Sequence, residues 1–460
     1  MIYVQPSIRT FAFSGGGLNL NPSALIQPGA NGNINSILVA SSDPSLINWS
    51  TTGPIFPVNG TTLNTCDASS PCAFFAVDQK LKTPYVLNWN VNLQQELTPS
   101  TALQVGYVAN HGVQLYSTID LNQVNTAIDD GSEQLGRPLT ASCAPPIGLG
   151  LGNGPCYPYI SFLNFLGNQS TSSYHSVQAT LTHRYAHGLY MLAGYTWAHA
   201  IDTAGNTSNL GFVPQNSLDY AAEKASSDYD IRHRFTLSLT YDLPSRKGFG
   251  QLLEGWQVTS IFTAQTGEPI LLYDNTNDLT GTDEGPDNAN NDRWNIVGNP
   301  NNLKWSATAP IPFYAVSYDD DGNVISRPPI CTSVSNTPAL LESLDYAGGC
   351  YAQNGVIIYP NAFDTFGNMP RNALRGPGFV NWDASISKLW RLSERFSLQL
   401  RGEMFNVLNH PNFAGSSIGG DLTDPSSFGR ANATPDVQAS NPVIGSGGSR
   451  HIQIGAKIIW

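Results

Sequence analysis

Apolar and polar residues alternate in short segments along this chain, and this alternation constrains the fold more than any other feature of the sequence. The last eleven residues, Arg450 to Trp460, show it clearly. One side carries Ile452, Ile454, Ala456, Ile458 and Trp460, and the other carries His451, Gln453, Gly455 and Lys457. A period of two indicates a β-strand with one apolar face and one wet face. Such a strand, about 9–11 residues long and tilted, crosses a bilayer, but it can equally contribute to the core of a soluble sandwich.

Nine segments of this kind are predicted as strands within residues 83–460. They lie near residues 85–96, 101–116, 174–185, 188–201, 230–243, 255–272, 379–390, 395–409 and 450–460. Residues 1–82 are predicted to hold a partial first strand, at 1–13, followed by a long loop. The longest predicted loop spans roughly 274–377, and another long segment spans 118–172.

The predicted connections alternate strictly between short turns and long loops, and all six cysteines fall on the long-loop side. A soluble sandwich or propeller has no reason to segregate its loops in this way. An outer-membrane barrel does, with short periplasmic turns and long extracellular loops. The sequence therefore predicts an all-β, antiparallel, up-and-down transmembrane β-barrel. A secreted all-β carbohydrate-binding or adhesion protein with disulfide-stapled loops remains the alternative.

The composition is consistent with lipid around the apolar faces, and it argues against nucleic-acid binding. Charged residues make up only 12% of the chain and no apolar run approaches the length of a membrane-spanning helix. The formal net charge of -12 argues against nucleic acid as a partner. The N-terminal stretch MIYVQPSIRTFAFSGGG lacks the cationic and apolar regions of a signal peptide, so we expect a processed protein or a fragment.

The six cysteines form three pairs that are close in sequence. The disulfide candidates are Cys66–Cys72, Cys143–Cys156 and Cys331–Cys350, each within a stretch rich in glycine, proline or asparagine. Six cysteines allow 15 pairings in principle, and six free thiols are the alternative. Paired cysteines would place the loops in an oxidising compartment.

No catalytic or metal-binding motif stands out, so the sequence predicts a protein that is not an enzyme and has no cofactor. The G-x-S-x-G pattern at 415–419 lies in a loop without the strand and helix of a nucleophile elbow. Weak calcium candidates are Asp319, Asp321, Asp283 and Asp287, for which a solvated acidic loop is the default interpretation.

Alternation also assigns side chains to the two faces of the predicted barrel. The lumen-facing polar candidates are Asn88, Asn90, Gln104, Gln178, Arg234, Gln399, Arg401 and Glu403. The candidates for two aromatic girdles at the membrane interfaces are Tyr107, Tyr185, Tyr190, Trp197, Tyr241, Trp256, Trp382, Trp390 and Trp460. In a soluble sandwich the same aromatic residues would belong to the core.

Several stretches resemble the C-terminal part of TonB-dependent outer-membrane receptors, most closely the Oar-like or carboxypeptidase-regulatory-like type. They include NWNVNLQQEL and QVGYVANHG (88–112), YHSVQATLTHRYAHGLYMLAGYTWAHAID (174–202), DIRHRFTLSLTYDLP (230–244), GWQVTSIFTAQTGEP (255–269), GNMPRNALRGPGFVNWDASISKLW (367–390), LQLRGEMFNVLNHPNF (398–413) and the terminal aromatic strand. The match runs from about residue 80 to the end.

This resemblance implies a barrel of about 22 strands, of which the chain would supply roughly the last ten. It implies ligand binding by extracellular loops, and passage through a polar lumen gated by a plug from elsewhere. The implied partners are outer-membrane lipid, the barrel-assembly machinery through the C-terminal strand, the missing plug and N-terminal barrel half, and TonB.

Overall fold

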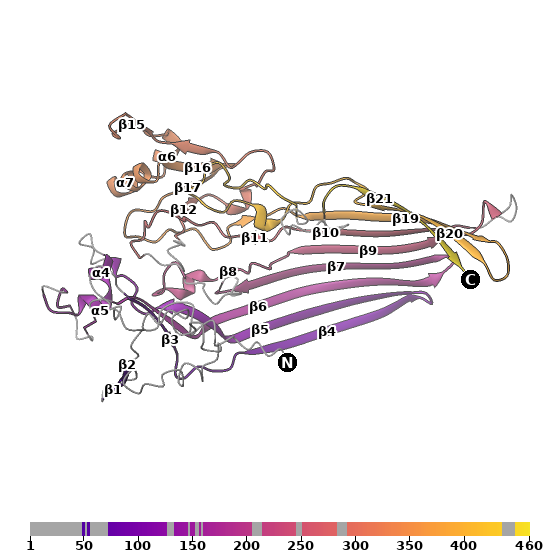
Figure 1. Ribbon diagram of the computed structural model, residues 1–460, viewed down its shortest axis with the longest axis horizontal. Helices are drawn as coiled ribbons and strands as arrows, with labels where there is room; N and C mark the ends of the chain where they lie inside the picture. The colour runs from indigo at the N-terminus through magenta and orange to yellow at the C-terminus, as the bar shows by residue number, and fades with distance from the viewer. Residues whose placement is uncertain are drawn as a thin grey trace.

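The computed structural model describes residues 48–50, 53–55, 72–126, 133–145, 148–151, 156–157, 160–204, 214–244, 251–282, 292–434 and 447–460. Its main feature is one long antiparallel sheet, which we call the wall (Figure 1). The wall strands are β4 (Tyr85–Thr98), β5 (Thr101–Asp120), β6 (Ile160–Ala186), β7 (Leu189–Asp202), β9 (His233–Asp242), β10 (Trp256–Gln265), β19 (Phe379–Arg391), β20 (Ser397–Phe405) and β21 (His451–Ile459).

The nine wall strands are neighbours in the same order as in the sequence, which is an up-and-down meander. The predicted antiparallel all-β fold is therefore confirmed. Two short strands join its margin: β3 (Cys72–Val77) pairs in parallel with β6, and β8 (Ala225–Ser226) pairs with β7. The sequence had assigned the residues of β3 to a loop. No helix in the described part of the chain has the length and apolar character needed to cross a membrane.

The connections separate to the two ends of the wall. Those between β4 and β5, β6 and β7, β9 and β10, and β19 and β20 lie at one end, which we call the turn end. The long connections lie at the other, the loop end (Figure 1). The β6–β7 turn is two residues, His187 and Gly188, whose φ angles of 53° and 82° are both left-handed. Tight antiparallel hairpins favour such a pair because its twist matches that of the strands.

Register carries the apolar faces of the strands into one continuous surface. Leu93 pairs with Val105, Val105 with Ala179, and Ala179 with Tyr195, and directly paired residues in an antiparallel sheet point to the same side. Val91 is 70% exposed and Ile454 83% exposed, so this apolar face is not packed against a second layer. The buried hydrophobic clusters of the described residues contain no residue of the nine wall strands. A sandwich core between the faces is thus excluded.

The wall is an open sheet with β4 and β21 at its edges. β4 leads into the β4–β5 turn and β21 follows the long β20–β21 connection, so both edge strands run from the loop end to the turn end. The partial strand predicted at 1–13 lies outside the described residues.

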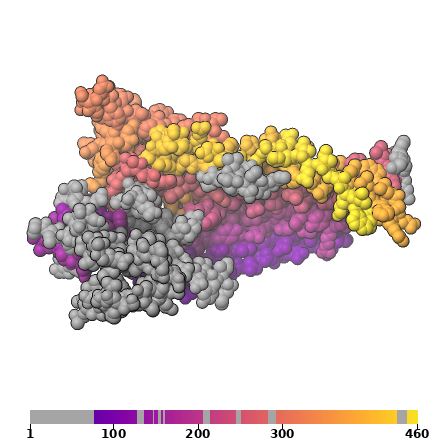
Figure 2. All heavy atoms as spheres, viewed as in Figure 1, coloured from indigo at the N-terminus to yellow at the C-terminus, as the bar shows by residue number. Residues whose placement is uncertain are grey.

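A folded unit stands at the loop end, where the sequence predicted one long loop at 274–377 (Figure 2). We call it the loop module and define it as residues 269–375 and 413–431. Its sheets are β11 (Pro269–Ile270) with β18 (Leu374–Arg375), β14 (Ser317–Tyr318) with β15 (Val324–Ser326), and a four-stranded sheet of β12 (Asn295–Val297), β17 (Val356–Tyr359), β16 (Gly349–Gln353) and β13 (Phe313–Ala315). Its helices are α6 (Pro329–Thr332), α7 (Pro338–Tyr346), η7 (Pro300–Asn302) and η8 (Gly415–Ser417).

The loop module has its own aromatic core. Tyr351 lies at the centre, with its ring centroid 4.3 Å from that of Phe428, 4.8 Å from Phe313 and 6.1 Å from Trp294. The prediction of a loop was wrong here because the strands of the module are too short to show a period, and only packing between distant segments stabilises them.

The remaining elements are short. They are α4 (Glu133–Gly136) and α5 (Pro138–Ala141) in the β5–β6 connection, η4 (Tyr220–Glu223) in the β7–β9 connection, and a separate hairpin of β1 (Asn48–Ser50) and β2 (Gly53–Ile55). The segment predicted as loop at 118–172 is partly wall, since β5 runs on to Asp120 and β6 begins at Ile160. The strand predicted to end at 272 ends at Gln265.

Candidate functional site at the loop end and polar face of the wall

The face of the wall opposite the apolar surface carries the eight polar residues that the sequence had grouped together. Gly106 pairs with Gln178, Gln178 with Thr196, and Thr196 with Arg234, so these positions form one row across four strands. The same register places Asn88, Asn90, Gln104, Gln399, Arg401 and Glu403 on this side. Arg401 and Glu403 also form an ion pair of 3.2 Å between neighbouring positions of β20.

The aromatic girdle candidates divide between the two faces. Tyr107, Trp197, Tyr241, Trp256, Trp382 and Trp390 lie on the apolar face, and Trp460 follows β21 with 88% of its surface exposed. Tyr190 does not share their face, because it pairs with Thr240 on the polar side. Tyr185 lies at a register shift of β6, and its hydroxyl donates to the carboxylate of Asp242, which pairs with Gln257 on the polar side.

A buried ion pair joins the β7–β9 connection to the loop module. Arg293 donates two hydrogen bonds to the carboxylate of Glu223, of 3.0 and 2.6 Å, and a third to the carbonyl of Met369, of 3.1 Å. Both side chains are at least 95% buried. Gln215 adds two hydrogen bonds to this contact: it accepts one from the Arg293 N–H at 2.8 Å and donates one to the carbonyl of Gly367 at 3.2 Å. Three separate segments are therefore fixed against one another.

A second ionic cluster joins the same connection to the segment that precedes β19. Arg371 is buried and pairs with Asp202 and Asp228, while Arg375 pairs with Asp230. Although burial opposes it, hydrogen bonds from the Ala200 N–H and from two arginines hold the pKa of Asp230 below its ordinary value. The carboxylate therefore stays charged at every physiological pH and keeps the cluster assembled.

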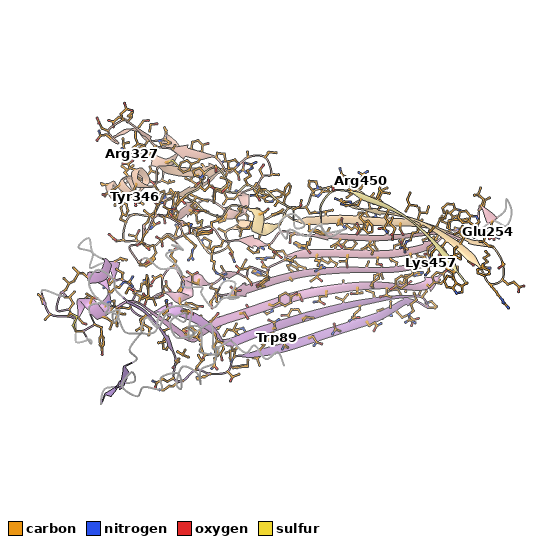
Figure 3. The ribbon with its side chains drawn as sticks, viewed as in Figure 1. Trp89, Glu254, Arg327, Tyr346, Arg450 and Lys457 are labelled. Carbon is orange, nitrogen blue, oxygen red and sulfur yellow. A yellow bond between two sulfur atoms is a disulfide. The ribbon has the colours of Figure 1, made fainter. Side chains whose placement is uncertain are left out.

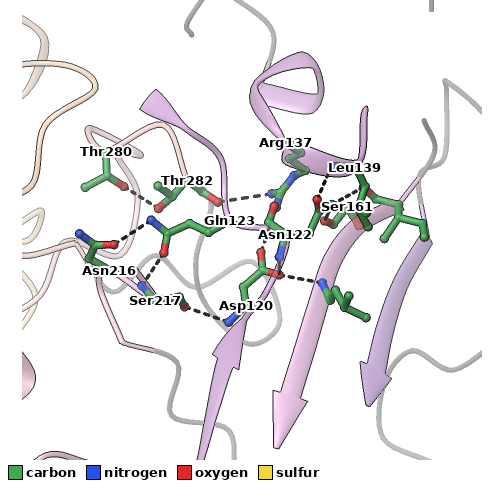
Figure 4. Close-up of polar contacts among 12 residues, drawn as sticks. Asp120, Asn122, Gln123, Arg137, Leu139, Ser161, Asn216, Ser217, Thr280 and Thr282 are labelled. Carbon is green, nitrogen blue, oxygen red and sulfur yellow. Dashed lines mark hydrogen bonds and ion pairs between the residues drawn. The ribbon is translucent and has the colours of Figure 1, made fainter. Parts of the chain in front are cut away.

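A third network reaches the β5–β6 connection (Figure 4). Arg137 is 2% exposed and donates to Asp120 at 3.1 Å and to the carbonyl of Thr282 at 3.4 Å. Gln123 donates to Asn216 at 3.0 Å and accepts from the Ser217 N–H. Together the three networks, which we call the clamps, join three long connections into one assembly at the loop end of the wall. Such buried and satisfied polar groups fix a unique arrangement of the loops.

A group of carboxylates lies beside this assembly in the loop module. Asp292 is 1% exposed and accepts hydrogen bonds from the N–H and hydroxyl of Thr280, while Asp274 accepts from Trp294. Burial, reinforced by the charge of Asp278, raises the pKa of Asp292 to about 7.

This shift predicts that the loop module loses stability as the pH rises. The folded carboxyl keeps its proton up to about pH 7, whereas the unfolded one releases it near 3.8. The contribution of this carboxyl to stability should therefore be greatest below about pH 3.8, fall between there and about pH 7 by at most about 1.4 kcal/mol per pH unit, and stay constant above that. Unfolding of the whole chain in detergent, followed by hydrogen exchange of residues 274–282, measures this. Asp292→Asn should flatten the profile, whereas Asp320→Asn, at an exposed position outside this group of carboxylates, should leave it unchanged.

The described residues contain no group of three or more histidine, cysteine, aspartate or glutamate side chains placed to hold a metal ion. The carboxylate of Asp319 accepts hydrogen bonds from Asn323 and from the Asp321 N–H, and these lower its pKa. It closes a turn of the chain. Asp283 and Asp287 lie outside the described residues. The hydroxyl of Ser417, in the G-x-S-x-G pattern, donates to two backbone carbonyls.

Two of the three predicted disulfides are present, Cys143–Cys156 and Cys331–Cys350. The second joins α6 to β16 within the loop module. Cys66 lies outside the described residues, so its pairing with Cys72 stays a prediction.

Sequence reasoning missed Glu223, Arg293, Arg371 and Arg375. Their one signal is that the chain has few cations, with 22 lysines and arginines in 460 residues. An arginine in a long loop of such a chain is a candidate for a buried ion pair. Finding its partner needs the fold, because Glu223 and Arg293 are 70 residues apart.

A family model described as the outer membrane beta barrel domain matches residues 10–453. The chain belongs to this family. It is accordingly a protein of the cell outer membrane, and the soluble alternative no longer applies. A comparison with curated proteins finds no match.

The solved structures that a comparison returns at low similarity include outer-membrane transporters. The outer membrane transporter YddB from Escherichia coli has 10% identity and a TM-score of 0.38, over 85% of this chain and 34% of that one. FpvA of P. aeruginosa, bound to heterologous pyoverdines, has 9% identity and a TM-score of 0.33, over 82% and 27%. The ferric citrate transporter FecA has 9% identity and a TM-score of 0.30, over 81% and 31%. The chain spans about a third of the length of these structures.

Proposed function

We propose that this chain is the C-terminal barrel portion of a TonB-dependent receptor-type transporter and that it performs no covalent chemistry. The observation that carries the proposal is the division of the wall into one continuous apolar face and one continuous polar face, with long connections at one end only. In a transporter the apolar face meets lipid and the polar row lines the lumen. The eight polar residues described above, from Asn88 to Glu403, would then contact water, a plug or the passing substrate.

The direction of the edge strands supports a role for further strands from elsewhere. β4 and β21 both run from the loop end to the turn end. Direct closure of the nine wall strands would join them in parallel, whereas membrane barrels of this kind are antiparallel throughout. An odd number of additional strands restores the alternation. We therefore expect the further strands, which are the predicted strand at 1–13 together with those of an N-terminal barrel half, to be odd in number, and the plug and the TonB contact to lie in that half as well.

Ligand binding would fall to the outer surface of the loop module. Its outermost part carries large exposed side chains: Tyr346 is 62% exposed and Ile325 is 67% exposed, beside the ion pair of Arg327 with Asp345 (Figure 3). The buried clamps beneath it fix this surface relative to the wall. A rigid arrangement lowers the entropic cost of binding.

The proposal predicts opposite effects of arginine at two adjacent positions of β9. Leu237 pairs with Ala193 and Phe262 on the apolar face, whereas Thr236 pairs with Gly194 and Thr263 on the polar face. Leu237→Arg should destabilise the folded chain by about 2–4 kcal/mol because it faces hydrocarbon, and Thr236→Arg should be nearly neutral. Urea unfolding in lipid vesicles measures both.

Cell fractionation is the complementary test. The unaltered chain should be recovered with outer membranes, require detergent, and migrate differently on gels before and after boiling. Recovery as a detergent-free soluble monomer would reject the proposal. If Leu237→Arg and Thr236→Arg destabilise the folded chain by the same amount, the two faces do not differ in their contact with lipid.

A further inference from the structure

Half of the histidines in the chain occupy one band of the apolar face. Of eight histidines, His111, His175, His199 and His233 lie at one level of the wall, which is the loop end of β7 and β9 and the middle of the longer strands β5 and β6. His111 pairs with Leu87, His175 with His199, and His233 with Trp197, so all four share the face of the apolar residues. The other four lie at the turn end, in the β20–β21 connection or, for His451, on the polar face.

The same tyrosine–histidine pair occurs twice in this band. The hydroxyl of Tyr107 lies 2.7 Å from Nδ1 of His175, and that of Tyr195 lies 2.8 Å from Nδ1 of His233. In both pairs the ring centroids are 6.2 Å apart, with interplanar angles of 25° and 24°. When the phenol donates to Nδ1, the neutral imidazole carries its proton on Nε2. Each ring thus presents an N–H donor away from its tyrosine.

The length of strand between the turn end and the band is about the length that crosses the hydrocarbon layer of a membrane. His175 lies eleven residues before Ala186 and His233 lies nine residues before Asp242, which are the turn-end residues of their strands. A tilted strand of about 9–11 residues spans the hydrocarbon layer. The band therefore lies at the boundary between hydrocarbon and head groups on the loop side. Trp89 on the edge strand marks the same level (Figure 3) and packs edge-on against His175.

The band offers hydrogen-bond donors and cations but no exposed carboxylate. β4, β6, β7 and β9 carry no aspartate or glutamate at an apolar-face position. The Asp230 carboxylate near His199 is fully buried against Arg232 and Arg375. Arg232 itself is 37% exposed and adds a guanidinium beside the imidazoles. The chain as a whole has a net charge of -12, so this lack of exposed carboxylates is a property of the band. The band is therefore complementary to anions.

We propose that this histidine belt, comprising His175, His233, Tyr107, Tyr195, Trp197 and Arg232, docks phosphate head groups of net negative charge, such as a phosphomonoester, in the lipid leaflet on the loop side. The imidazole Nε2–H groups and the guanidinium donate to phosphate oxygens, and charge-assisted bonds of this kind are the strong ones. The aromatic rings occupy the interface. The inference rests on the proposed function, because it requires the apolar face to lie in a bilayer.

The test uses the full chain inserted into vesicles of phosphatidylcholine with or without phosphatidic acid. After detergent extraction, mass spectrometry counts the phosphatidic acid that stays bound to each chain. His175→Phe with His233→Phe keeps the rings but removes the donors, and should reduce this retention about tenfold, which corresponds to about 1.4 kcal/mol. The matched control, His183→Phe with His451→Phe, changes two histidines outside the belt and should retain phosphatidic acid like the unaltered chain.

Equal retention by the belt variant and the control would overturn the proposal, as would equal retention of phosphatidylcholine and phosphatidic acid by the unaltered chain. His175→Gln with His233→Gln restores an N–H donor and should recover part of the retention. A chain that fails to enter the vesicles rejects the proposed function instead. An inserted chain without lipid preference rejects the belt alone.

Discussion

Replacing Arg293 by methionine is expected to destabilise the loop module by about 3–5 kcal/mol, because it leaves the buried Glu223 carboxylate without its cationic partner and with the 3.3 Å hydrogen bond from the Gln215 N–H. Glu223 is 1% exposed, and Arg293 supplies both of its strongest hydrogen bonds. The variant also frees the carbonyl of Met369, so the β7–β9 connection should detach from the module. Hydrogen exchange of residues 214–230 and denaturant unfolding of the whole chain would detect the loss.

A double variant separates the ion pair from the packing around it. Glu223→Leu combined with Arg293→Met removes both charges, and replacing a buried ion pair by apolar groups of similar volume is often nearly neutral. The double variant should therefore recover most of the stability that either single variant loses. If Arg293→Met alone unfolds at the same denaturant concentration as the unaltered chain, the clamp has no structural role.

Replacing Trp294 by alanine should cost about 3–5 kcal/mol, since it removes a large side chain from the centre of the module. Trp294 is 1% exposed, lies beside Tyr351 and donates from its indole to Asp274 at 2.7 Å. The loss combines a cavity with the removal of one hydrogen bond from the buried Asp274 carboxylate, which keeps those from Thr276 and Asn277. Unfolding of the module, followed by hydrogen exchange at β16 and β17, measures it.

Trp197→Ala is the matched control for this variant. Trp197 lies on the apolar face of β7 and is 54% exposed, so its removal should leave the module unchanged. Equal protection of β16 and β17 in the Trp294 and Trp197 variants would show that the aromatic cluster does not hold the module together.

The loop module connects these predictions to the proposed function. Its core joins residues from 270–374 with residues from 413–431, and the clamps join it to the β5–β6 and β7–β9 connections. A variant that loosens one clamp therefore alters the presentation of the whole outer surface. Ligand affinity should fall with module stability even for substitutions that touch no ligand, because a loosened surface must be reordered on binding.

The sequence by itself determined the wall, since alternation in a strand is a local property. The residues from Tyr85 to Leu93 show which side of β4 is apolar without reference to any other strand. The same logic placed all eight polar residues on one face. The prediction for Tyr190 did not use this alternation, because it counted the residue among the girdle aromatics near strand ends. The structure pairs Tyr190 with Thr240 on the polar face, whereas Leu189 and Met191 lie on the apolar side.

Only the tertiary structure decided the loop module and its clamps. Trp294, Tyr351 and Phe428 form one core, and Glu223 meets Arg293, although no short-range pattern links any of these positions. Short strands and buried ion pairs gain their stability from contacts between distant segments, and closing such loops depends on the whole chain. The two faces of the wall can be predicted from the alternation within each strand. The core of the loop module depends on contacts between segments that are far apart in the sequence, so no single segment predicts it.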